Sequence, residues 1–218
     1  GVSLSPEEWD RIVTWIDANA LFYGTFNPEE QAKQLRGERI AGPALIVGSS
    51  ILILADQLSD QGAAGLAARL GARTADHLEH TSPEGVAAMA RAGTVAVLLP
   101  GAFHFLKEGQ APPVEGFRRA GVPMAVSTDM NPGSPPLASL LTAMSLACVH
   151  LCLTPEEALK GATTHAARAL GLQEDRGTLE VGKRADLALW EVGHPRELSY
   201  WMGLNPCVQV VKDGEGAT

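Results

Sequence analysis

Short apolar runs alternate with Ala-rich amphipathic stretches from about residue 45 onward, at intervals of roughly 20 to 30 residues. The apolar runs are typical of buried strands, and the stretches between them have the spacing of helices. We predict strands over residues 51–55, 74–78, 94–99 and 123–128, and helices over 62–70, 82–93 and 113–120. Strands that alternate with helices in this way form parallel sheets. The central part of the chain therefore predicts four consecutive βα units.

The pattern changes after residue 129. A loop rich in Pro and Gly leads into a long apolar helix over residues 137–151, and a capping sequence at 154–157 opens a second helix that runs to residue 171. Two helices without a strand between them mark the end of the βα repetition. Gly-rich turns then separate three further predicted strands, over residues 177–182, 185–190 and 207–212. This tail predicts a small separate sheet.

The first residues have a different character. Ser5, Pro6 and Glu8 form the pattern of a helix start, and apolar residues follow at helical spacing as far as Ile16. The stretch that continues to Pro43 is mixed in character. We interpret residues 1–43 as a helical appendage, residues 44–176 as the main α/β part and residues 177–218 as a β-rich tail.

Composition and charge exclude several classes of function. The 218 residues are 45% hydrophobic and carry a formal net charge of −8, so no general phosphate-neutralising surface exists and nucleic acid is not an expected partner. Apolar runs fall short of the roughly 20 residues that a membrane helix needs, and the first residues show no secretory signal. Three cysteines do not make a disulfide framework and indicate a reducing compartment. We therefore expect a cytoplasmic protein, and a small-molecule substrate is what the resemblance described below implies.

Polar side chains follow the predicted strands, where ligands gather in parallel α/β folds. Asp129 comes directly after the apolar strand predicted over residues 123–128, and a carboxylate there can bind a metal or move a proton. Gln57 and His77 follow two other strands, and a neutral imidazole can polarise a carbonyl. The loop that continues from Asp129 offers an amide, a close backbone approach and a hydroxyl for a substrate carboxylate, from Asn131, Gly133 and Ser134.

Each candidate also has a structural interpretation. Asp129 could cap the loop that follows it, the loop could be an ordinary Pro/Gly turn, and His77 could be a hydrogen-bonded structural histidine. Cys148 and Cys152 lie one helical turn apart and could hold a metal, but their apolar surroundings favour small buried thiols. We expect the remaining histidines to be structural or solvated, namely His80, His104, His150, His165 and His194.

Five segments together resemble the imidazolonepropionase family, part of the metal-dependent amidohydrolase superfamily. They begin at Ala55-Asp56-Gln57, Ala75-Asp76-His77, Leu98-Leu99-Pro100, Ser127-Thr128-Asp129 and Gly177-Thr178-Leu179. The Thr-Asp-x-Asn-Pro-Gly-Ser stretch is the most specific, and the similarity extends over residues 55–215 in register. It does not extend over residues 1–43, which we interpret as an appendage of unrelated or uncertain origin.

The resemblance implies a fold and an activity. The fold would be α/β, a partial (β/α)8 barrel of about four units with C-terminal helices and a β-sandwich remnant, equivalent to the C-terminal half of the enzyme. The family uses a Zn or Fe ion to open the ring of 4-imidazolone-5-propanoate with water, which gives N-formimidoyl-L-glutamate in histidine degradation. On this basis Asp129 matches a metal-binding, proton-shuttling residue, His77 an active-site histidine, and Gln57, Asn131, Gly133 and Ser134 match substrate or product contacts.

The chain also departs from the family pattern. The family has a His-x-His pair on its first strand, which this sequence lacks, and a His at the position of Leu54. Three of four expected metal ligands are therefore missing, and a full barrel of this kind needs about 250 residues. This leaves two hypotheses: an enzyme whose other half lies elsewhere, or a catalytically incomplete half-barrel that associates with a partner chain, including a second copy of itself.

Overall fold

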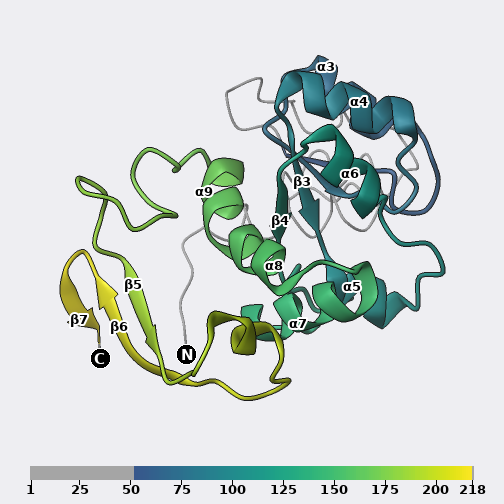
Figure 1. The fold of residues 1–218 in the computed structure, drawn as a ribbon. Coiled ribbons are helices and arrows are strands. Elements are labelled where there is room, and N and C mark those ends of the chain that lie inside the picture. Colours follow the sequence, from purple (N-terminus) through teal and green to yellow (C-terminus); the bar gives the residue numbers. More distant parts are fainter. Residues whose placement is uncertain (1–51, 218) are drawn as a thin grey trace, which may run out of the picture. The chain divides into compact units, whose positions relative to one another are not determined.

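A computed structural model describes residues 52–217 of the chain (Figure 1). The chain divides into two units, residues 1–47 and 48–218, and all the features described below belong to the second. The helices predicted within residues 1–43, and the first residue of the strand predicted at 51, lie outside the described residues.

Four parallel strands form the main sheet, in the order β1-β2-β3-β4. Their bounds are Leu52–Ala55, Thr74–His77, Val95–Leu98 and Met124–Val126. All three strand pairs are parallel, with Ala55 opposite His77 and Leu98 opposite Val126. This confirms the predicted α/β fold with βα units, and within residues 52–217 the sheet does not close into a barrel.

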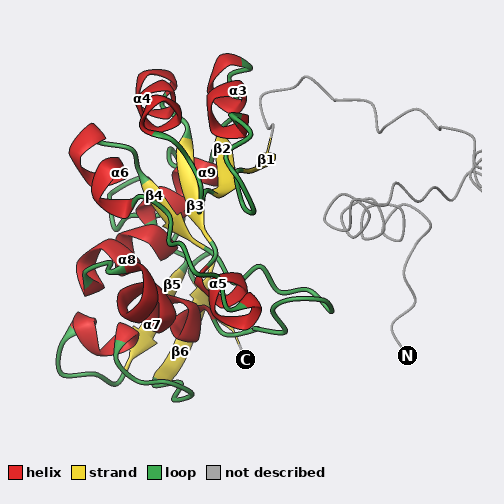
Figure 2. Cartoon of the chain, turned by 90° about the vertical axis from the view of Figure 1, so that its right-hand side faces the viewer, coloured by secondary structure: helices red, strands yellow, loops and turns green. Residues whose placement is uncertain are grey.

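The helices between the strands cover the sheet and complete its core (Figure 2). They are α3 (Ala63–Arg69), α4 (Pro83–Ala92), α5 (Pro100–Leu106) and α6 (Val114–Ala120). Ser82 accepts a hydrogen bond from the backbone N–H of Gly85 and so starts α4, and Gly93 ends that helix at a φ of 73°. Phe117 of α6, Met89 of α4 and Leu98 of β3 are fully buried in one core cluster.

Helix α5 was not expected from the sequence. Pro100-Gly101 suggested only a strand end, but proline is also favoured in the first turn of a helix, where its missing N–H has no partner to lose. Gly101 is required there, because a Cβ atom would lie 2.7 Å from Leu137 and 2.8 Å from Pro135. The chain therefore forms a helix directly after β3.

The helices that follow the sheet are α7 (Leu140–Leu151), α8 (Pro155–Ala162) and α9 (Thr164–Leu170). The single helix predicted from 154 to 171 is wrong, because Thr163 leaves the helical conformation at φ −126° and ψ −89°. Its hydroxyl donates to the backbone oxygen of Leu159 at 2.7 Å and so closes α8. The break lets α8 and α9 each contact β4.

A second sheet holds three antiparallel strands in the order β5-β6-β7. They are β5 (Leu187–Trp190), β6 (Cys207–Lys212) and β7 (Glu215–Ala217), and a 3-10 helix, η1 (Pro195–Ser199), lies between β5 and β6. The small β-rich tail is thus confirmed. The strand predicted over 177–182 is wrong, since that segment turns between two glycines with φ of 94° and 92°.

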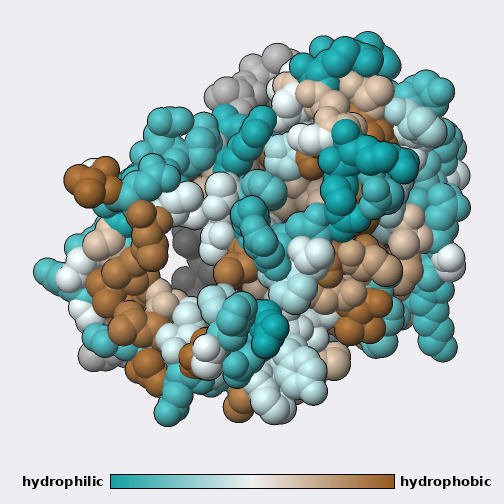
Figure 3. Space-filling view, viewed as in Figure 1, coloured by the Kyte–Doolittle hydropathy of each residue, from teal (hydrophilic) through white to brown (hydrophobic). Residues whose placement is uncertain are grey.

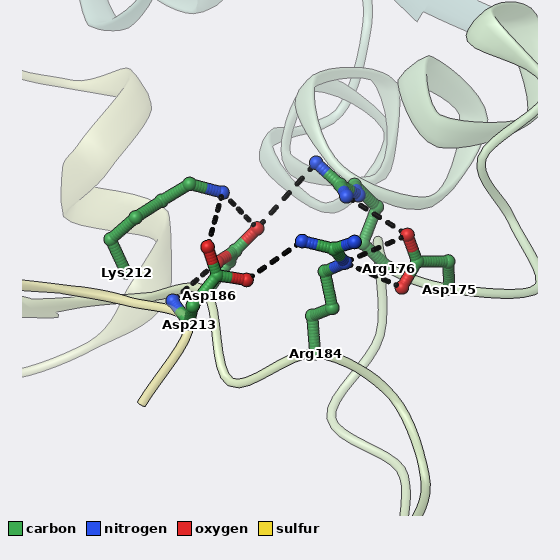
Figure 4. A network of polar contacts seen from close by, with 6 residues as sticks. All are labelled: Asp175, Arg176, Arg184, Asp186, Lys212 and Asp213. Carbon is green, nitrogen blue, oxygen red and sulfur yellow. Dashed lines mark hydrogen bonds and ion pairs between the residues drawn. The ribbon is translucent and has the colours of Figure 1, made fainter. Parts of the chain in front are cut away.

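Ion pairs hold the loop before β5 against the sheet (Figure 4). Arg184 contacts Asp175 at 3.1 Å and Asp213 at 2.8 Å. Lys212 contacts Asp186 at 2.8 Å, and the carboxylate of Asp186 also accepts from the backbone N–H of Asp213. These charged groups link the loop to the β6–β7 turn.

The antiparallel sheet leaves much of its apolar surface uncovered. Val208 of β6 is 62% exposed, and Leu189 of β5 is 44% exposed. Hydrophobic side chains gather over this part of the molecule in Figure 3, beside a hollow. A cavity of about 1280 Å³ lies between α7–α9 and this sheet, and its lining includes Leu141, Leu159, Trp190 and Val210.

Between residues 52 and 217, no helix combines the length and the apolar character needed to cross a bilayer.

Candidate active site

Strained backbone gathers at the carboxyl edge of the parallel sheet. Asp56, which follows β1, has a φ of 49°, His77 and Leu78 at the end of β2 have φ of 75° and 74°, and Asp129 after β4 has a φ of 50°. Residues other than glycine rarely adopt these positive φ values, and each residue that does so costs on the order of 1–3 kcal/mol of stability. Such residues cluster at functional sites, so this edge is the candidate active site.

His77 and Glu79 are buried side by side at this edge. They are 2% and 1% exposed, and His77 Nδ1 lies 3.8 Å from Glu79 Oε1. Within the described residues, His77 Nδ1 and Glu79 Oε2 have no hydrogen-bond partner. A buried polar atom without a partner costs free energy, and in a native protein it points to a bound group or a catalytic role. Glu79 was missed from the sequence, although its place in Asp-His-Leu-Glu directly after a strand was a usable signal.

Two carboxyl groups in the same place have raised pKa values. The pKa of Asp76 rises to about 6, chiefly because burial disfavours the charged form; Asp129 acts in the same direction and His77 against it. Burial also raises the pKa of Asp129, His77 opposes the change, and Glu79 adds to it. The structure therefore brings His77 and Asp129 within electrostatic range of each other, as the sequence predicted. Carboxyl groups that titrate nearer neutral pH can accept and return protons.

Leu54 lies in the row of the sheet that contains Asp76. Parallel pairing sets Leu54 opposite Asp76, Asp76 opposite Val97 and Val97 opposite Ala125, so these side chains share one face. Leu54 is 41% exposed, and Ala125 is 3% exposed. An apolar side chain thus stands beside the carboxyl group of Asp76, at the position where the resembled family has a histidine.

Asp56 and Gln57 follow β1 at the same edge, but the two have different surroundings. Asp56 is 5% exposed and accepts hydrogen bonds from the backbone N–H groups of Gln61, Ala63 and Ala64. It therefore closes the β1–α3 connection. Gln57 is half-buried at the edge, and its predicted role as a substrate contact stays a prediction.

The loop after Asp129 is held in shape by Asn131. Its Oδ1 accepts from the backbone N–H groups of Gly133 at 2.9 Å and Ser134 at 2.6 Å. Its Nδ2 donates to the backbone oxygens of Asp129, at 2.8 Å, and Ser134. This favours the structural interpretation of Asn131 in the free protein, because both of its polar atoms are engaged within the loop.

Two further histidines and two cysteines lie apart from this edge. His165 contacts the backbone oxygen of Met124 at 2.9 Å, and His194 Nδ1 accepts from the backbone N–H of Arg196. Cys148 is half-buried, and burial raises the pKa of its thiol. The expectation that Cys152 is buried is wrong, because the chain leaves helix α7 at this residue, at a φ of 57°, and exposes it.

The described residues do not fit a metal centre of the kind that the resemblance implies. From residue 52 to residue 217, no group of three or more His, Cys, Asp and Glu side chains is arranged to hold a metal ion. Asp129 is the predicted metal ligand, and the matching position on β1 is Leu54. The chemistry that this edge offers by itself is therefore proton transfer and hydrogen bonding, from its carboxyl and imidazole groups.

The chain is similar in sequence to imidazolonepropionases of several bacteria. The chain is 54% identical over 204 residues to an imidazolonepropionase of Ralstonia nicotianae, which is 93% of this chain and 48% of that relative. It is 53% identical over 190 residues to an imidazolonepropionase of Maricaulis maris, which is 87% of this chain and 46% of that relative. The chain thus spans about half the length of these curated relatives.

Solved structures share the fold. An adenosine deaminase from Xanthomonas campestris, solved with bound zinc, matches 86% of this chain and 47% of its own, with a TM-score of 0.65 and 20% identity. A mutant atrazine chlorohydrolase from Arthrobacter aurescens, complexed with zinc and atraton, matches 66% of this chain and 35% of its own at a TM-score of 0.58 and 25% identity. Both of these solved structures contain zinc, and their likeness to this chain is one of fold.

The profile of the amidohydrolase family matches residues 12–215. The match begins within the segment 1–43, which the sequence alone left outside the resemblance. It covers most of the chain, and the imidazolonepropionase relatives agree with it. The resemblance noted from the five sequence segments is confirmed, and this chain belongs to the amidohydrolase family.

Proposed function

We propose that this chain is part of a hydrolase of the imidazolonepropionase type, which opens the ring of 4-imidazolone-5-propanoate with water to give N-formimidoyl-L-glutamate. The observation that carries the proposal is the meeting of His77, Asp129, Asp76 and Glu79 at the carboxyl edge of the sheet. Relatives of that name at 54% and 53% identity support the choice of substrate.

The acid–base roles follow from burial and charge. Asp129, whose pKa is raised by burial, accepts a proton from the attacking water and returns it to the leaving nitrogen. His77 donates a hydrogen bond to the carbonyl oxygen of the imidazolone ring, where negative charge develops as water attacks. Glu79 Oε1 lies 3.8 Å from His77 Nδ1, outside hydrogen-bond distance, and acts on the imidazole through its negative charge.

Substrate binding is assigned to Gln57 and to the loop after Asp129. The propanoate carboxylate would accept hydrogen bonds from Ser134 and from the backbone of Gly133. In the free protein, the N–H groups of both residues donate to Asn131 Oδ1. We propose that the substrate carboxylate replaces Asn131 Oδ1 as the acceptor of these two N–H groups. The Asn131 amide is then free to contact the product.

The Zn or Fe ion used by the resembled family cannot be held by the described residues alone. The part of these residues in the reaction is therefore confined to proton transfer and substrate binding. The two ligands of the family's His-x-His pair would have to come from the half of the relatives that this chain does not span, and the third would require a histidine at position 54.

A complementation assay tests the proposal. The chain is mixed with the half of the Ralstonia nicotianae relative that it does not match, with Zn²⁺ or Fe²⁺ and 4-imidazolone-5-propanoate, and N-formimidoyl-L-glutamate is measured by mass spectrometry. We expect turnover with the variant Leu54→His and loss of at least a hundredfold with the double variant Leu54→His/Asp129→Asn. No product with Leu54→His, under conditions where the intact relative is active, would contradict the proposal.

A second candidate function is a catalytically incomplete half-barrel that acts only through association with a partner chain or with a second copy of itself. The uncovered apolar strands of the β5–β7 sheet favour it, because exposed faces of this kind mark interaction surfaces. Sedimentation velocity of the purified chain separates the two. Dimers or larger species without activity would support this candidate, and an active monomer would exclude it.

A further inference from the structure

Two histidines from different helices meet on the surface between α5 and α7. His104 lies in the last turn of α5, and His150 lies at the end of α7, 46 residues further along the chain. His104 Nδ1 and His150 Nε2 are 3.0 Å apart, and the ring centroids are 5.0 Å apart at an interplanar angle of 35°. The proposed reaction does not use this pair.

The two helices hold the pair in place. Gly101 and Ala102 of α5 are buried, as are Ala147 and Leu151 of α7, so both helix backbones are anchored in the interior. The ring of Phe103 lies 5.8 Å from the ring of His150 and supports it from one side. His104 is exposed and His150 is half-buried, so both side chains are accessible to water. The arrangement is therefore rigid in its backbone and open to solvent at the nitrogens.

The separation of the nitrogens suits a shared ion. A histidine nitrogen binds Zn²⁺ at about 2.0–2.1 Å, so two such ligands at an angle of about 90–110° lie about 2.9–3.4 Å apart. The observed 3.0 Å falls in this range. In the free protein a single proton can bridge the two nitrogens, since a neutral imidazole offers one donor and one acceptor. A metal ion would replace that proton and engage both lone pairs.

We propose that His104 and His150 form a binding site for one divalent transition metal ion that prefers imidazole, such as Zn²⁺, Ni²⁺ or Cu²⁺. Water completes the coordination, because the pair faces solvent. Bound metal joins the end of α5 to the end of α7. Ions that prefer oxygen ligands, such as Mg²⁺ and Ca²⁺, do not bind there.

Isothermal titration of the full chain with NiCl₂ and, separately, with ZnCl₂ tests the site. We expect one ion per chain, and a loss of affinity of at least tenfold in each of the variants His104→Ala and His150→Ala. His194→Ala is the matched control, because it also removes one exposed histidine, and it should leave the affinity unchanged. All six histidines and all three cysteines lie within the described residues, so the competing ligands are known.

A second measurement does not depend on titration heats. An ion that binds only the folded chain raises the unfolding temperature, so Ni²⁺ should raise it for the wild type and for His194→Ala but not for His150→Ala. Equal affinity in the wild type, His104→Ala and His150→Ala would overturn the proposal. Loss of binding in Cys152→Ser or Asp129→Asn, with the His104→Ala variant unaffected, would also overturn it, because the ion would then lie elsewhere.

Discussion

The parallel sheet β1–β4 and the antiparallel sheet β5–β7 differ in how much of their apolar surface the chain itself covers. Val95 and Leu98 of β3 are fully buried, whereas Leu189 of β5 is 44% exposed, and Val208 and Val210 of β6 are 62% and 44% exposed. Helices cover the parallel sheet, as its βα connections require. The antiparallel sheet is joined to the rest by ion pairs in the loop before β5 and stands beside a cavity.

The parallel sheet is therefore packed on its own, whereas the packing of the antiparallel sheet is incomplete. The parallel sheet has its own core, so the site at its carboxyl edge can keep its geometry in this chain alone. The antiparallel sheet keeps an apolar face that nothing in the described part of the chain covers. We therefore expect partner segments to bind at the antiparallel sheet.

The largest effect should come from a matched pair of leucine substitutions, one in each sheet. Leu98→Ala removes a fully buried side chain and should lower the free energy of unfolding by about 2–5 kcal/mol. Leu189→Ala, at 44% exposure, should cost less than about 1 kcal/mol. Urea unfolding followed by circular dichroism measures both. Equal losses would show that the two sheets are equally covered in solution.

A glycine pair tests the packing of α8 on β4. A Cβ at Gly161 would lie 2.9 Å from Val126 Cγ2 and 3.1 Å from the backbone oxygen of Met124. Gly161→Ala should therefore destabilise the chain by about 1–3 kcal/mol, despite the higher helix propensity of alanine. At Gly116 of α6 the nearest atom would be 3.6 Å away, so Gly116→Ala should stabilise by about 0.5–1 kcal/mol. Opposite signs in thermal unfolding are the expected result, and a stabilising Gly161→Ala would contradict the close approach.

A pH effect of intermediate size should come from the contact between α6 and α8. The Arg118 guanidinium, 2.7 Å from Glu157, lowers the pKa of that carboxyl to about 2 from an ordinary value of 4.5. A folded-state pKa below the unfolded one stabilises the fold above about pH 4.5, and this contribution is lost as the pH falls toward about 2. After allowance for solvent screening, Glu157→Gln should cost about 1 kcal/mol at pH 7 and almost nothing at pH 2.

The control for this prediction is Glu156→Gln, whose partner Lys160 is exposed on the same helix. It should have a smaller effect at pH 7. Stability curves against pH, measured by urea unfolding, should converge for the wild type and Glu157→Gln only at acid pH. Curves that stay parallel down to pH 2 would assign the difference to an effect that does not depend on the charge of Glu157.

The smallest effect should come from the ion pairs beside the antiparallel sheet. Asp186→Asn removes a carboxylate whose pKa is lowered chiefly by its hydrogen bond with Lys212, and so weakens that contact at 2.8 Å. The pairs lie at the surface, so the shift in unfolding temperature should be the smallest of this series and should shrink further as NaCl is raised. A shift that exceeds that of Glu157→Gln, or that does not depend on salt, would show that the network is structurally essential.

Much of the site could be predicted because its signals are local. His77 ends β2 and Asp129 follows β4, and the parallel sheet brings these strand ends together. Glu79 was missed because its significance depends on burial beside His77. Asn131 was predicted as a substrate contact, yet its hydrogen bonds lie within its own loop, which depends on the backbone path of residues 129–134. The roles of all six predicted site residues, and the division of the chain at residue 43, stay predictions; the six are His77, Asp129, Gln57, Asn131, Gly133 and Ser134.

The sequence by itself determined the alternation of strands and helices, the caps at Ser82 and Thr154, and the family, because these depend on neighbouring residues and on short motifs. Only the tertiary structure decided the break at Thr163, the loss of the strand at 177–182 and the pairing of His104 with His150. Each of these depends on contacts or backbone conformations that chain spacing does not specify. The same holds for the uncovered face of the antiparallel sheet, since exposure is a property of the assembled fold.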